Sequence, residues 1–333
     1  MRSDRIRMGL IGCGGISRAH RDGFLALSDQ VQVAATCDTQ LELAEERRIE
    51  LEADRAYRDY RDILDRKDID AVDIMLPHDL HKEVTIAAAQ AGKHILCEKP
   101  IASDETSARE MIEAANNAGV LLMIAYCERY GNAHQEMKRL VESGAVGDPF
   151  LLRIDHSQWV HMPAGHWIND PSKLGGGVVA GSGTHRLDLL RWFGGEVRRV
   201  AARFLHTGLT PLGGEDTAVI SVEFAGGAIG EMVCTWSAQR APWYETLMVH
   251  GSRGVVHNLD GVKISRNGGD FEGVSLSHDD PYGFREEIRH FLSCVRSGET
   301  PLTNGNEALK TLRLVNKVYE AANSECWIEV TNE

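Results

Sequence analysis

Residues 6–17 read IRMGLIGCGGIS, a short apolar run that ends in a cluster of glycines. The run 6–11 predicts a strand, and the amphipathic stretch 17–27 predicts a helix. Glycines at such a junction allow a sharp turn and let the backbone approach a pyrophosphate, which the helix N-terminus attracts. The alternative is an ordinary strand-to-helix turn. We expect a dinucleotide-binding turn formed by Gly12, Cys13, Gly14, Gly15 and Ile16.

A second apolar run, 31–37, is followed directly by Asp38. An acid at the end of the second strand is placed to bind the ribose 2'-hydroxyl of NAD and to repel the 2'-phosphate of NADP. The next residues, Thr39 and Gln40, offer no positive charge to a phosphate. We therefore expect NAD in preference to NADP.

The first half of the chain alternates apolar runs with amphipathic stretches. Strands are predicted at 71–76, 94–97 and 121–125, and helices at 79–91 and 103–118. Strands joined by helices of this length form right-handed units of a parallel sheet. We expect a doubly wound parallel α/β (Rossmann) domain over residues 1–127.

The second half changes to a period of two. Ala218, Ile220, Val222 and Phe224 alternate with more polar residues, and Gly226-Gly227 then predicts a hairpin turn. We expect residues 128–333 to form an α+β domain with a large, open, mainly antiparallel sheet. Helices at 183–193, 282–296 and 306–322 would cover one face, and the other face would bind a second copy of the chain.

Composition restricts the function further. The 333 residues include 49 acidic and 36 basic side chains, and the net charge of -13 disfavours binding to nucleic acid or to an anionic membrane. The N-terminus has the pattern of neither a signal peptide nor a membrane span. Seven cysteines without a CxxC pair suit a reducing compartment, so we expect a cytoplasmic protein.

Several further motifs extend along the chain: MLPHDLHKEV at 75–84, CEKP at 97–100, three glycines at 175–177 and GTHRLD at 183–188. With the glycine turn, they make the sequence similar to the glucose-fructose oxidoreductase / inositol dehydrogenase / rhizopine-catabolism (Gfo/Idh/MocA) family along nearly its whole length. The resemblance implies an NAD(P)-dependent dehydrogenase that acts on CH-OH groups of sugars, inositols or related polyols. It also implies a homodimer or homotetramer assembled through the C-terminal sheet.

Lys99 lies just beyond a predicted strand, at the edge where doubly wound sheets bind ligands. Its ammonium could stabilise the oxygen of a substrate as hydride leaves the carbon. A plain surface lysine is the alternative, but the flanking Glu98 and Pro100 favour a site. The resemblance places Pro77, His81, Glu98 and Lys99 at the cofactor.

His185 and Asp188 are three residues apart on a predicted helix and therefore share a face. The carboxylate could support an imidazole that takes a hydroxyl proton. The resemblance places His185 at the family's acid/base position and Asp188 at a commonly acidic one. A helix histidine and an ion-paired acid are the structural alternatives.

One position departs from the family pattern. Many of the sugar dehydrogenases carry an aspartate four residues before the histidine, whereas this chain has Gly181. Glycine can neither accept a proton nor hold a charge. Either another group substitutes, or the reaction is not a plain alcohol oxidation. The candidates for a substitute are Asp170, His166, Tyr126 and Ser182.

The segment before that helix contains His156, His161 and His166. Spacings of five on an extended strand alternate between faces, so we expect no metal site. A sugar ring stacks well on an indole, which makes Trp167 and its neighbour His166 candidate substrate contacts. Arg129 is a candidate contact for cofactor or substrate, with a salt bridge as the alternative.

Two other functions stay open at this point. Some members of the family hydrolyse glycosides by transient oxidation, elimination, hydration and re-reduction, without net change in NADH. A non-catalytic NAD-binding regulatory protein would keep the dinucleotide site, but the intact EKP tripeptide and His185 argue against it.

Overall fold

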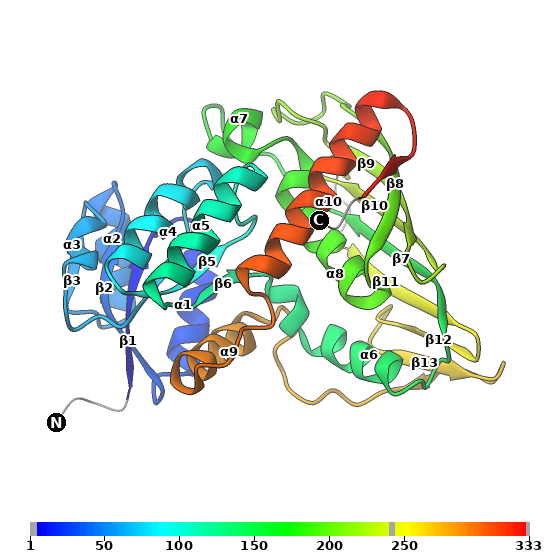
Figure 1. Ribbon diagram of the computed structural model, residues 1–333, viewed down its shortest axis with the longest axis horizontal. Helices are drawn as coiled ribbons and strands as arrows, with labels where there is room; N and C mark the ends of the chain where they lie inside the picture. Colours follow the sequence, from blue (N-terminus) through cyan, green and yellow to red (C-terminus); the bar gives the residue numbers. More distant parts are fainter. Residues whose placement is uncertain (1–4, 240–243, 331–333) are drawn as a thin grey trace. The chain divides into compact units, whose positions relative to one another are not determined.

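The computed structural model describes residues 5–239 and 244–330, which form two compact units. The first unit contains the chain up to Tyr130 together with Tyr282–Leu309. The second contains Gly131–Pro281 and the residues from Lys310 onward. Each unit has its own sheet, one parallel and one mixed (Figure 1). The predicted fold class, a doubly wound α/β domain plus an α+β domain with a large open sheet, is confirmed.

The first unit is built on six parallel strands in the order β3-β2-β1-β4-β5-β6. The order runs outward in both directions from the neighbours β1 and β4. Their carboxyl ends therefore form a switch point, which is where open parallel sheets bind ligands. The strands are β1 (Ile6–Ile11), β2 (Val31–Cys37), β3 (Arg55–Tyr57), β4 (Ala71–Ile74), β5 (His94–Glu98) and β6 (Leu122–Ala125).

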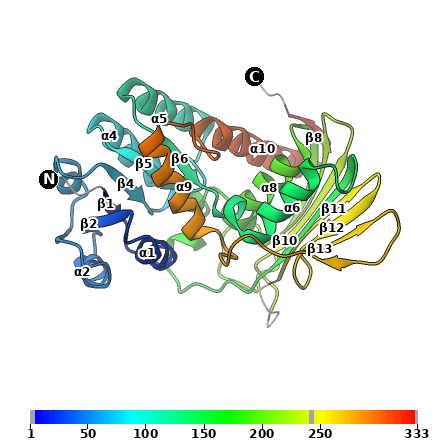
Figure 2. The same ribbon diagram turned by 90° about the horizontal axis from the view of Figure 1, so that it is seen from below.

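Helices cover both faces of this sheet. Figure 2 shows α1 and α9 on one side and α4 and α5 on the other. Continuous apolar runs such as that of β4, which is buried along its whole length, are what two covered faces require. The helices are α1 (Ser17–Ala26), α2 (Leu41–Glu50), α3 (Arg61–Leu64), α4 (His81–Gln90), α5 (Glu105–Ala118) and α9 (Phe284–Ser297), with short turns η1 (His78–Leu80) and η2 (Cys127–Tyr130).

Helix α9 corrects one expectation. We expected the helix at 282–296 to cover the second sheet, but α9 packs against α1 in the first unit. Gly23 of α1 leaves room for this contact, since a Cβ there would lie 2.7 Å from Ile288 Cδ1. Ile288, Phe291 and Leu292 share a buried cluster with Phe24. Local periodicity identifies the apolar face of a helix but not its partner.

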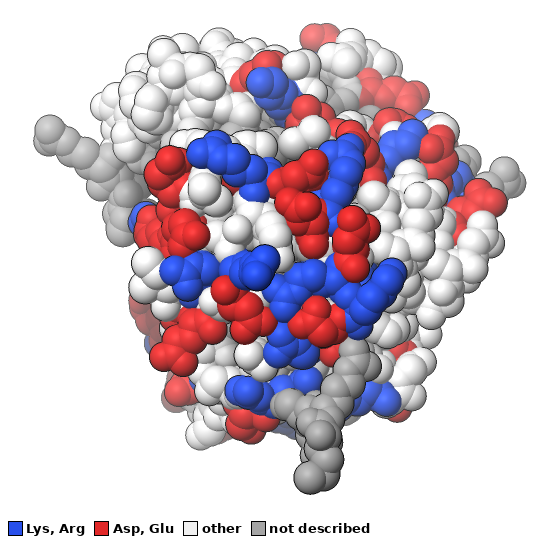
Figure 3. All heavy atoms as spheres, turned by 90° about the vertical axis from the view of Figure 1, so that its left-hand side faces the viewer, with Lys and Arg blue, Asp and Glu red and all other residues white. Residues whose placement is uncertain are grey.

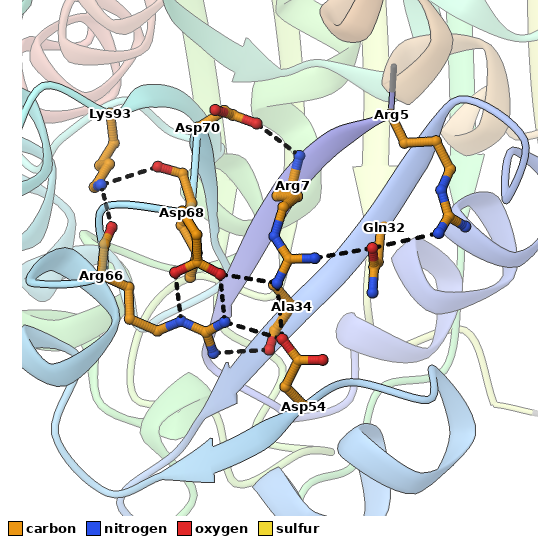
Figure 4. Close-up of polar contacts among 10 residues, drawn as sticks. Arg5, Arg7, Gln32, Ala34, Asp54, Arg66, Asp68, Asp70 and Lys93 are labelled. Carbon is orange, nitrogen blue, oxygen red and sulfur yellow. Dashed lines mark hydrogen bonds and ion pairs between the residues drawn. The ribbon is translucent and has the colours of Figure 1, made fainter. Parts of the chain in front are cut away.

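A network of ion pairs closes the amino end of the parallel sheet (Figure 4). Arg7 of β1 lies 2.8 Å from the carboxylates of both Asp54 and Asp68, and Arg66 binds the same two groups. Figure 3 shows basic and acidic side chains similarly interspersed on one face of the molecule. The network lies opposite the ligand-binding edge, so we assign it to stability.

The second unit is built on nine strands in the order β14-β13-β12-β11-β7-β10-β9-β8-β15. All strand pairs are antiparallel except β7 with β10, which is parallel. The strands are β7 (Pro149–Ser157), β8 (Val197–Leu205), β9 (Thr217–Phe224), β10 (Ile229–Thr235), β11 (Tyr244–Gly251), β12 (Gly254–His257), β13 (Lys263–Arg266), β14 (Glu272–Gly273) and β15 (Ile328–Glu329).

The predicted hairpin is present. Strands β9 and β10 pair in register, and Gly227 adopts φ 91° in the turn between them. Ala218, Ile220, Val222 and Phe224 are all buried, as their alternation predicts. They face a core shared with the helices of this unit.

The helices of the second unit gather on one face of its sheet, as Figure 2 shows for α6 and α8. The unit contains α6 (Asn132–Glu142), the turn η3 (Trp167–Asn169), α7 (Pro171–Leu174), the π-helical segment η4 (Val179–Gly183), α8 (Thr184–Gly194) and most of α10 (Gly305–Ser324). Along β9 and β10 the opposite face carries residues that are partly or fully exposed, among them Val219 and Ile229.

Candidate active site

The glycine turn connects β1 to α1 at the switch point of the parallel sheet. Gly12 has φ 97°, and a Cβ there would lie 2.2 Å from the carbonyl oxygen of Met75. Only glycine fits this position, because both the conformation and the close approach exclude a side chain. A Cβ on Gly14 or Gly15 would meet no atom within 4 Å, so the backbone borders open space there.

Ser17 occupies the position at which dinucleotide-binding turns have a third glycine or an alanine. It is fully buried at the start of α1. Its hydroxyl donates to the carbonyl oxygen of Gly14 at 2.6 Å. This bond fixes the turn from the helix side. The residue is therefore part of the turn.

Asp38 lies at the carboxyl end of β2 and contacts the same turn. Its Oδ2 accepts a hydrogen bond from the Cys13 amide at 2.9 Å, and its Oδ1 accepts one from the Gln40 amide at 2.9 Å. A carboxylate has about four acceptor positions, so two amides leave capacity for a hydroxyl group. The structure thus joins the predicted acid directly to the predicted turn.

Lys99 follows β5, next to the switch point. The carboxylate of Glu98 folds back, and its Oε2 accepts a hydrogen bond from the Lys99 amide at 3.1 Å. Glu98 is buried. The backbone of Lys99 is therefore anchored at the edge of the sheet where ligands bind.

His81, at the start of α4, is fully buried. Its Nδ1 lies 2.8 Å from the carbonyl oxygen of Pro100, and its Nε2 lies 2.9 Å from that of Leu76. Burial lowers the pKa of His81, so the neutral ring donates to one of these carbonyls at a time. The ring connects the loop before Pro77 to the loop after Lys99.

Two further candidates lie near the end of the first unit's β6. Tyr126 is buried directly after the strand. Arg129 in η2 is also buried, and its Nη2 lies 3.8 Å from Glu307 Oε2. A salt bridge was the structural alternative to ligand binding for Arg129, and the contact with Glu307 is such a salt bridge.

In the second unit, His185 is the second residue of α8 and is 9 % exposed. The five residues before α8 form the π-helical segment η4. Short π-helical segments inside or beside α-helices frequently occur at functional sites. Asp188 lies one turn further along and accepts a hydrogen bond from the Thr311 hydroxyl at 2.9 Å.

Gly181, the position that departs from the family pattern, lies under an indole. A Cβ there would come within 2.1 Å of Trp236 Cη2. Trp236 is buried at the end of β10 and fills the space that any side chain at position 181 would need. Among the proposed substitutes, Ser182 is adjacent to this contact, and its hydroxyl is buried without a hydrogen-bond partner.

The glycine run before η4 is held by a pair that we call the Glu215–Tyr319 clamp. The Tyr319 hydroxyl donates to Glu215 Oε1 at 2.8 Å, and both groups accept hydrogen bonds from the Gly177 amide at 3.1 Å. A Cβ on Gly176 would lie 1.9 Å from the Tyr319 hydroxyl oxygen. The glycines are needed because the clamp lies against their backbone.

His166 and Asp170 shape the loop between β7 and α7. Asp170 caps α7 by accepting hydrogen bonds from the amide and hydroxyl of Ser172, and these bonds lower the pKa of the carboxyl group. A lowered pKa makes it a weak general base. His166 Nδ1 accepts from the Ile168 amide at 3.3 Å, and its ring stacks beside Trp167.

The three spaced histidines of the second unit have different surroundings. His156 is buried, and its Nδ1 lies 3.1 Å from Arg186 Nη2. Burial, then the Arg186 charge, lowers the pKa of His156 to about 3. His161 is exposed and stacks on Trp159. Within residues 5–239 and 244–330, no group of three His, Cys, Asp or Glu side chains has the arrangement of a metal site.

Family models match both parts of the chain. Residues 6–126 match the oxidoreductase family with an NAD-binding Rossmann fold, and residues 134–257 match the GFO/IDH/MocA C-terminal domain. Together these matches cover well over half of the sequence. The chain belongs to the Gfo/Idh/MocA family.

Relatives in the Gfo/Idh/MocA family align over almost the full length. The D-apiose dehydrogenase of Paraburkholderia graminis is 29% identical, over 98% of this chain and 90% of that protein. The myo-inositol 2-dehydrogenase of Thermotoga maritima is 28% identical, over 93% and 94%. The structure of a levoglucosan dehydrogenase in complex with NADH and levoglucosan superposes with a TM-score of 0.92 at 25% identity, covering 99% of this chain and all of that one.

The protein is therefore an NAD-dependent oxidoreductase of the Gfo/Idh/MocA type, and its residues fit the cofactor. The open space beside Gly14 and Gly15 leaves room for a pyrophosphate at the start of α1. Asp38 lies beside this turn with acceptor positions free for a ribose. In the described part of the chain, no helix combines the length and the apolar character that a membrane crossing needs.

Sequence reasoning missed several residues that contact the predicted site residues, or the segments that carry them, within each unit. Trp236, Glu215 and Tyr319 contact the segment before His185 from distant strands and helices, and no spacing in the sequence connects them to it. His20 and Asp73 were also missed. A signal existed only for Asp73, because an acid inside the apolar run of β4 needs a buried partner.

Proposed function

We propose that this protein oxidises a secondary hydroxyl group of a sugar, an inositol or a related polyol. The observation that carries the proposal is the anchored Lys99, whose backbone is fixed through Glu98 at the carboxyl edge of the NAD-binding sheet. The relatives named as D-apiose and myo-inositol dehydrogenases support the substrate class. NAD, when bound, supplies the hydride acceptor for such an oxidation.

His185 accepts the hydroxyl proton in this proposal. It lies at the start of α8, directly after η4, and it is mostly buried. A histidine is suited to the role because its ordinary pKa is close to neutral pH. Asp188 supports the same helix through Thr311, and we propose for it a positioning role toward His185.

Lys99 stabilises the substrate oxygen. An ammonium group near a developing alkoxide lowers the free energy of the transition state more than that of the neutral alcohol. With Lys99 and His185 in these roles, no carboxylate is required at position 181. The contact between Gly181 and Trp236 supports this assignment, since it leaves no space for one.

The loop between β7 and α7 is proposed to bind the carbohydrate. His166 and Trp167 present partly exposed, neighbouring rings, and an aromatic face suits the C–H face of a sugar. Asp170 takes no proton in this proposal, because Ser172 holds it as a helix cap. We propose that Asp38 gives the enzyme its preference for NAD over NADP, because its carboxylate binds a ribose 2'-hydroxyl and repels a 2'-phosphate.

We further propose that the outer face of the nine-stranded sheet binds a second copy of the chain. Val219 and Ile229 are about half exposed on this face, and one covered face leaves such residues in water. The mass in solution, measured by light scattering, tests this proposal. A monomer at micromolar concentration would contradict it.

A reducing cytoplasm is the proposed location. All seven cysteines are free, and six of them are buried. Burial raises the pKa of the Cys13 thiol to about 12, so it stays in the unreactive protonated form. Location of a tagged protein in cell fractions tests this point.

The experiment for the proposed function is a panel of free sugars, cyclitols and glycosides incubated with NAD. The absorbance of NADH and the release of aglycone are followed together. Net NADH formation with a sugar or cyclitol is the expected result. Aglycone release without net NADH would instead identify the glycoside-hydrolase route. The absence of both signals would contradict an enzymatic role on these substrates.

A further inference from the structure

His20 lies in a buried chain of charged groups beneath the Lys99 turn. It is on α1, the helix that begins at the glycine turn, and its ring is fully buried. Its Nδ1 lies 2.7 Å from Asp73 Oδ2 on β4. Its Nε2 lies 3.1 Å from Glu98 Oε1 at the end of β5.

The second oxygen of Glu98 continues this chain to Lys99. Glu98 Oε2 accepts the hydrogen bond from the Lys99 amide, so one carboxylate connects the His20 ring to the Lys99 backbone. Moving the ring would therefore move the residue that carries the amine.

Two carboxylates on one imidazole restrict its protonation. A neutral imidazole can donate a hydrogen bond from only one nitrogen. Its other nitrogen carries a lone pair, which would repel the lone pairs of the second carboxylate. A ring with both nitrogens protonated donates to both carboxylates. Both ring N–H groups are then hydrogen-bonded, and the positive ring is bound between two negative groups, although Asp73 Oδ1 is buried without a hydrogen-bond partner.

His81 in the same unit is a natural comparison. It is equally buried, but its two nitrogens face uncharged carbonyl oxygens, and burial lowers its pKa. For His20 burial acts in the same direction, but the charges and hydrogen bonds of Asp73 and Glu98 outweigh it and raise the pKa well above its ordinary value.

The two carboxyl groups differ. Burial alone would raise the pKa of Glu98, but the hydrogen bond and charge of His20, together with the charges of Lys99 and His81, lower it; at Asp73 burial dominates and raises the pKa. Asp73 is the nearer partner of the ring, at 2.7 Å against 3.1 Å, whereas Glu98 is the partner that leads to Lys99. The ring of Phe284, 5.6 Å from that of His20, adds no charge.

We propose that His20 is a positioning residue for the reaction: a doubly protonated imidazole, bound between Asp73 and Glu98, that holds the Glu98 side chain and through it the Lys99 turn. This inference rests on the proposed function, because it takes Lys99 as the group that stabilises the substrate oxygen. It adds a link between α1, which starts at the dinucleotide turn, and the turn that carries the amine.

The first test is nuclear magnetic resonance of the parent protein labelled with ¹⁵N-histidine, at pH 8.5 and without substrate. One histidine should show both ring nitrogens protonated, and this signal should be missing in His20→Gln. If that variant fails to fold, Asp73→Asn assigns the signal, because removing one carboxylate returns the ring toward the neutral form. A spectrum with only neutral rings at this pH would overturn the proposal.

The second test separates positioning from stability. His20→Gln should lower kcat about tenfold or more, since small displacements of a catalytic group are costly, while the Kd for NADH changes less than about twofold. His94→Gln, at the opposite end of β5, is the matched control and should keep the parent kcat. An unchanged kcat in His20→Gln, or equal losses in kcat and NADH affinity, would overturn the positioning role.

The two proposals fail in different ways. If the parent protein oxidises no polyol, the proposed function fails, while the resonance signal still reports the protonation of His20. If the parent protein is active and His20→Gln is equally active, only the positioning role fails.

Discussion

The indole of Trp236 covers the Cα of Gly181 so closely that a Cβ at position 181 would lie 2.1 Å from Trp236 Cη2. Gly181→Ala should therefore lower the free energy of unfolding by about 1–3 kcal/mol through overpacking. Gly226→Ala is the control, because a Cβ there meets nothing within 4 Å. Urea unfolding of the two variants makes the comparison.

A double variant separates the contact from a general effect of the substitution. Trp236→Leu creates space, so Gly181→Ala should cost less free energy in that background than in the parent. Equal costs in both backgrounds would show that Trp236 is not what excludes a side chain.

Asp38 supplies the second prediction. Its carboxylate lies beside the glycine turn, so Asp38→Ala should remove the repulsion of a 2'-phosphate and raise the ratio of kcat/KM for NADP to that for NAD. Asp22→Ala, an exposed acid on α1, should leave the ratio unchanged. Steady-state kinetics with both cofactors provide the measurement, and equal kinetics in the parent protein would rule out the role.

The Glu215–Tyr319 clamp supplies the third prediction. Tyr319→Phe removes a hydroxyl that bonds to Glu215 and to the amides of Gly177 and Ala180, which should cost about 1–2 kcal/mol of stability. Because the clamp borders the segment before His185, kcat should fall as well. Tyr60→Phe, at a surface hydrogen bond with Glu83, is the control. Unchanged stability and turnover in Tyr319→Phe would remove the clamp from the account.

Acid unfolding supplies the fourth prediction. Hydrogen bonds from Arg66 and Arg7 hold the pKa of Asp68 well below its ordinary value. A lowered pKa in the folded state stabilises the protein above the unfolded pKa, near about 3.9, and this stabilisation is lost as pH falls below it. Asp68 is about half exposed, with a side-chain exposure of 48%, so the effect should stay below about 1 kcal/mol.

The variant Arg66→Ala tests this assignment. It should be less stable than the parent at pH 6, and the difference should shrink between about pH 4 and pH 2 as the carboxylates are protonated in both proteins. Thermal unfolding across this range measures the difference. A difference that stays constant with pH would contradict the role of the ion pairs.

Much of the first unit could be predicted because its signals are local. Strands Ile6–Ile11 and Val31–Cys37 have the expected bounds, since each is a continuous apolar run closed by a turn residue. The three-residue strand β3, Arg55–Tyr57, was not predicted. It is only partly buried at the edge of the sheet and has no apolar run to reveal it.

The second unit was harder to predict because its organisation depends on distant pairings. The alternation in β9 identified a half-buried strand, but no local pattern showed that β7 and β10 pair in parallel. The same limit applies to the site. The glycine run 175–177 was visible in the sequence, whereas its reason, the clamp from Glu215 and Tyr319, comes from positions far along the chain.

Lys99 and His185 supply the fifth prediction. Lys99→Ala and His185→Ala should each lower kcat by about 10² or more, because each removes a group that acts on the reacting oxygen or its proton. The Kd for NADH should change little in His185→Ala. Circular dichroism is the control that checks whether both variants are folded. Near-normal turnover in either folded variant would remove that residue from the mechanism.

The stoichiometry of the parent reaction distinguishes a net oxidation of the polyol from a transient one. With the best substrate from the panel, the amount of NADH formed is compared with the amount of polyol consumed. For a net dehydrogenase we expect one NADH for each hydroxyl group oxidised to a carbonyl group. Consumption of substrate with no net NADH would contradict a net oxidation, because the oxidation would then be only transient.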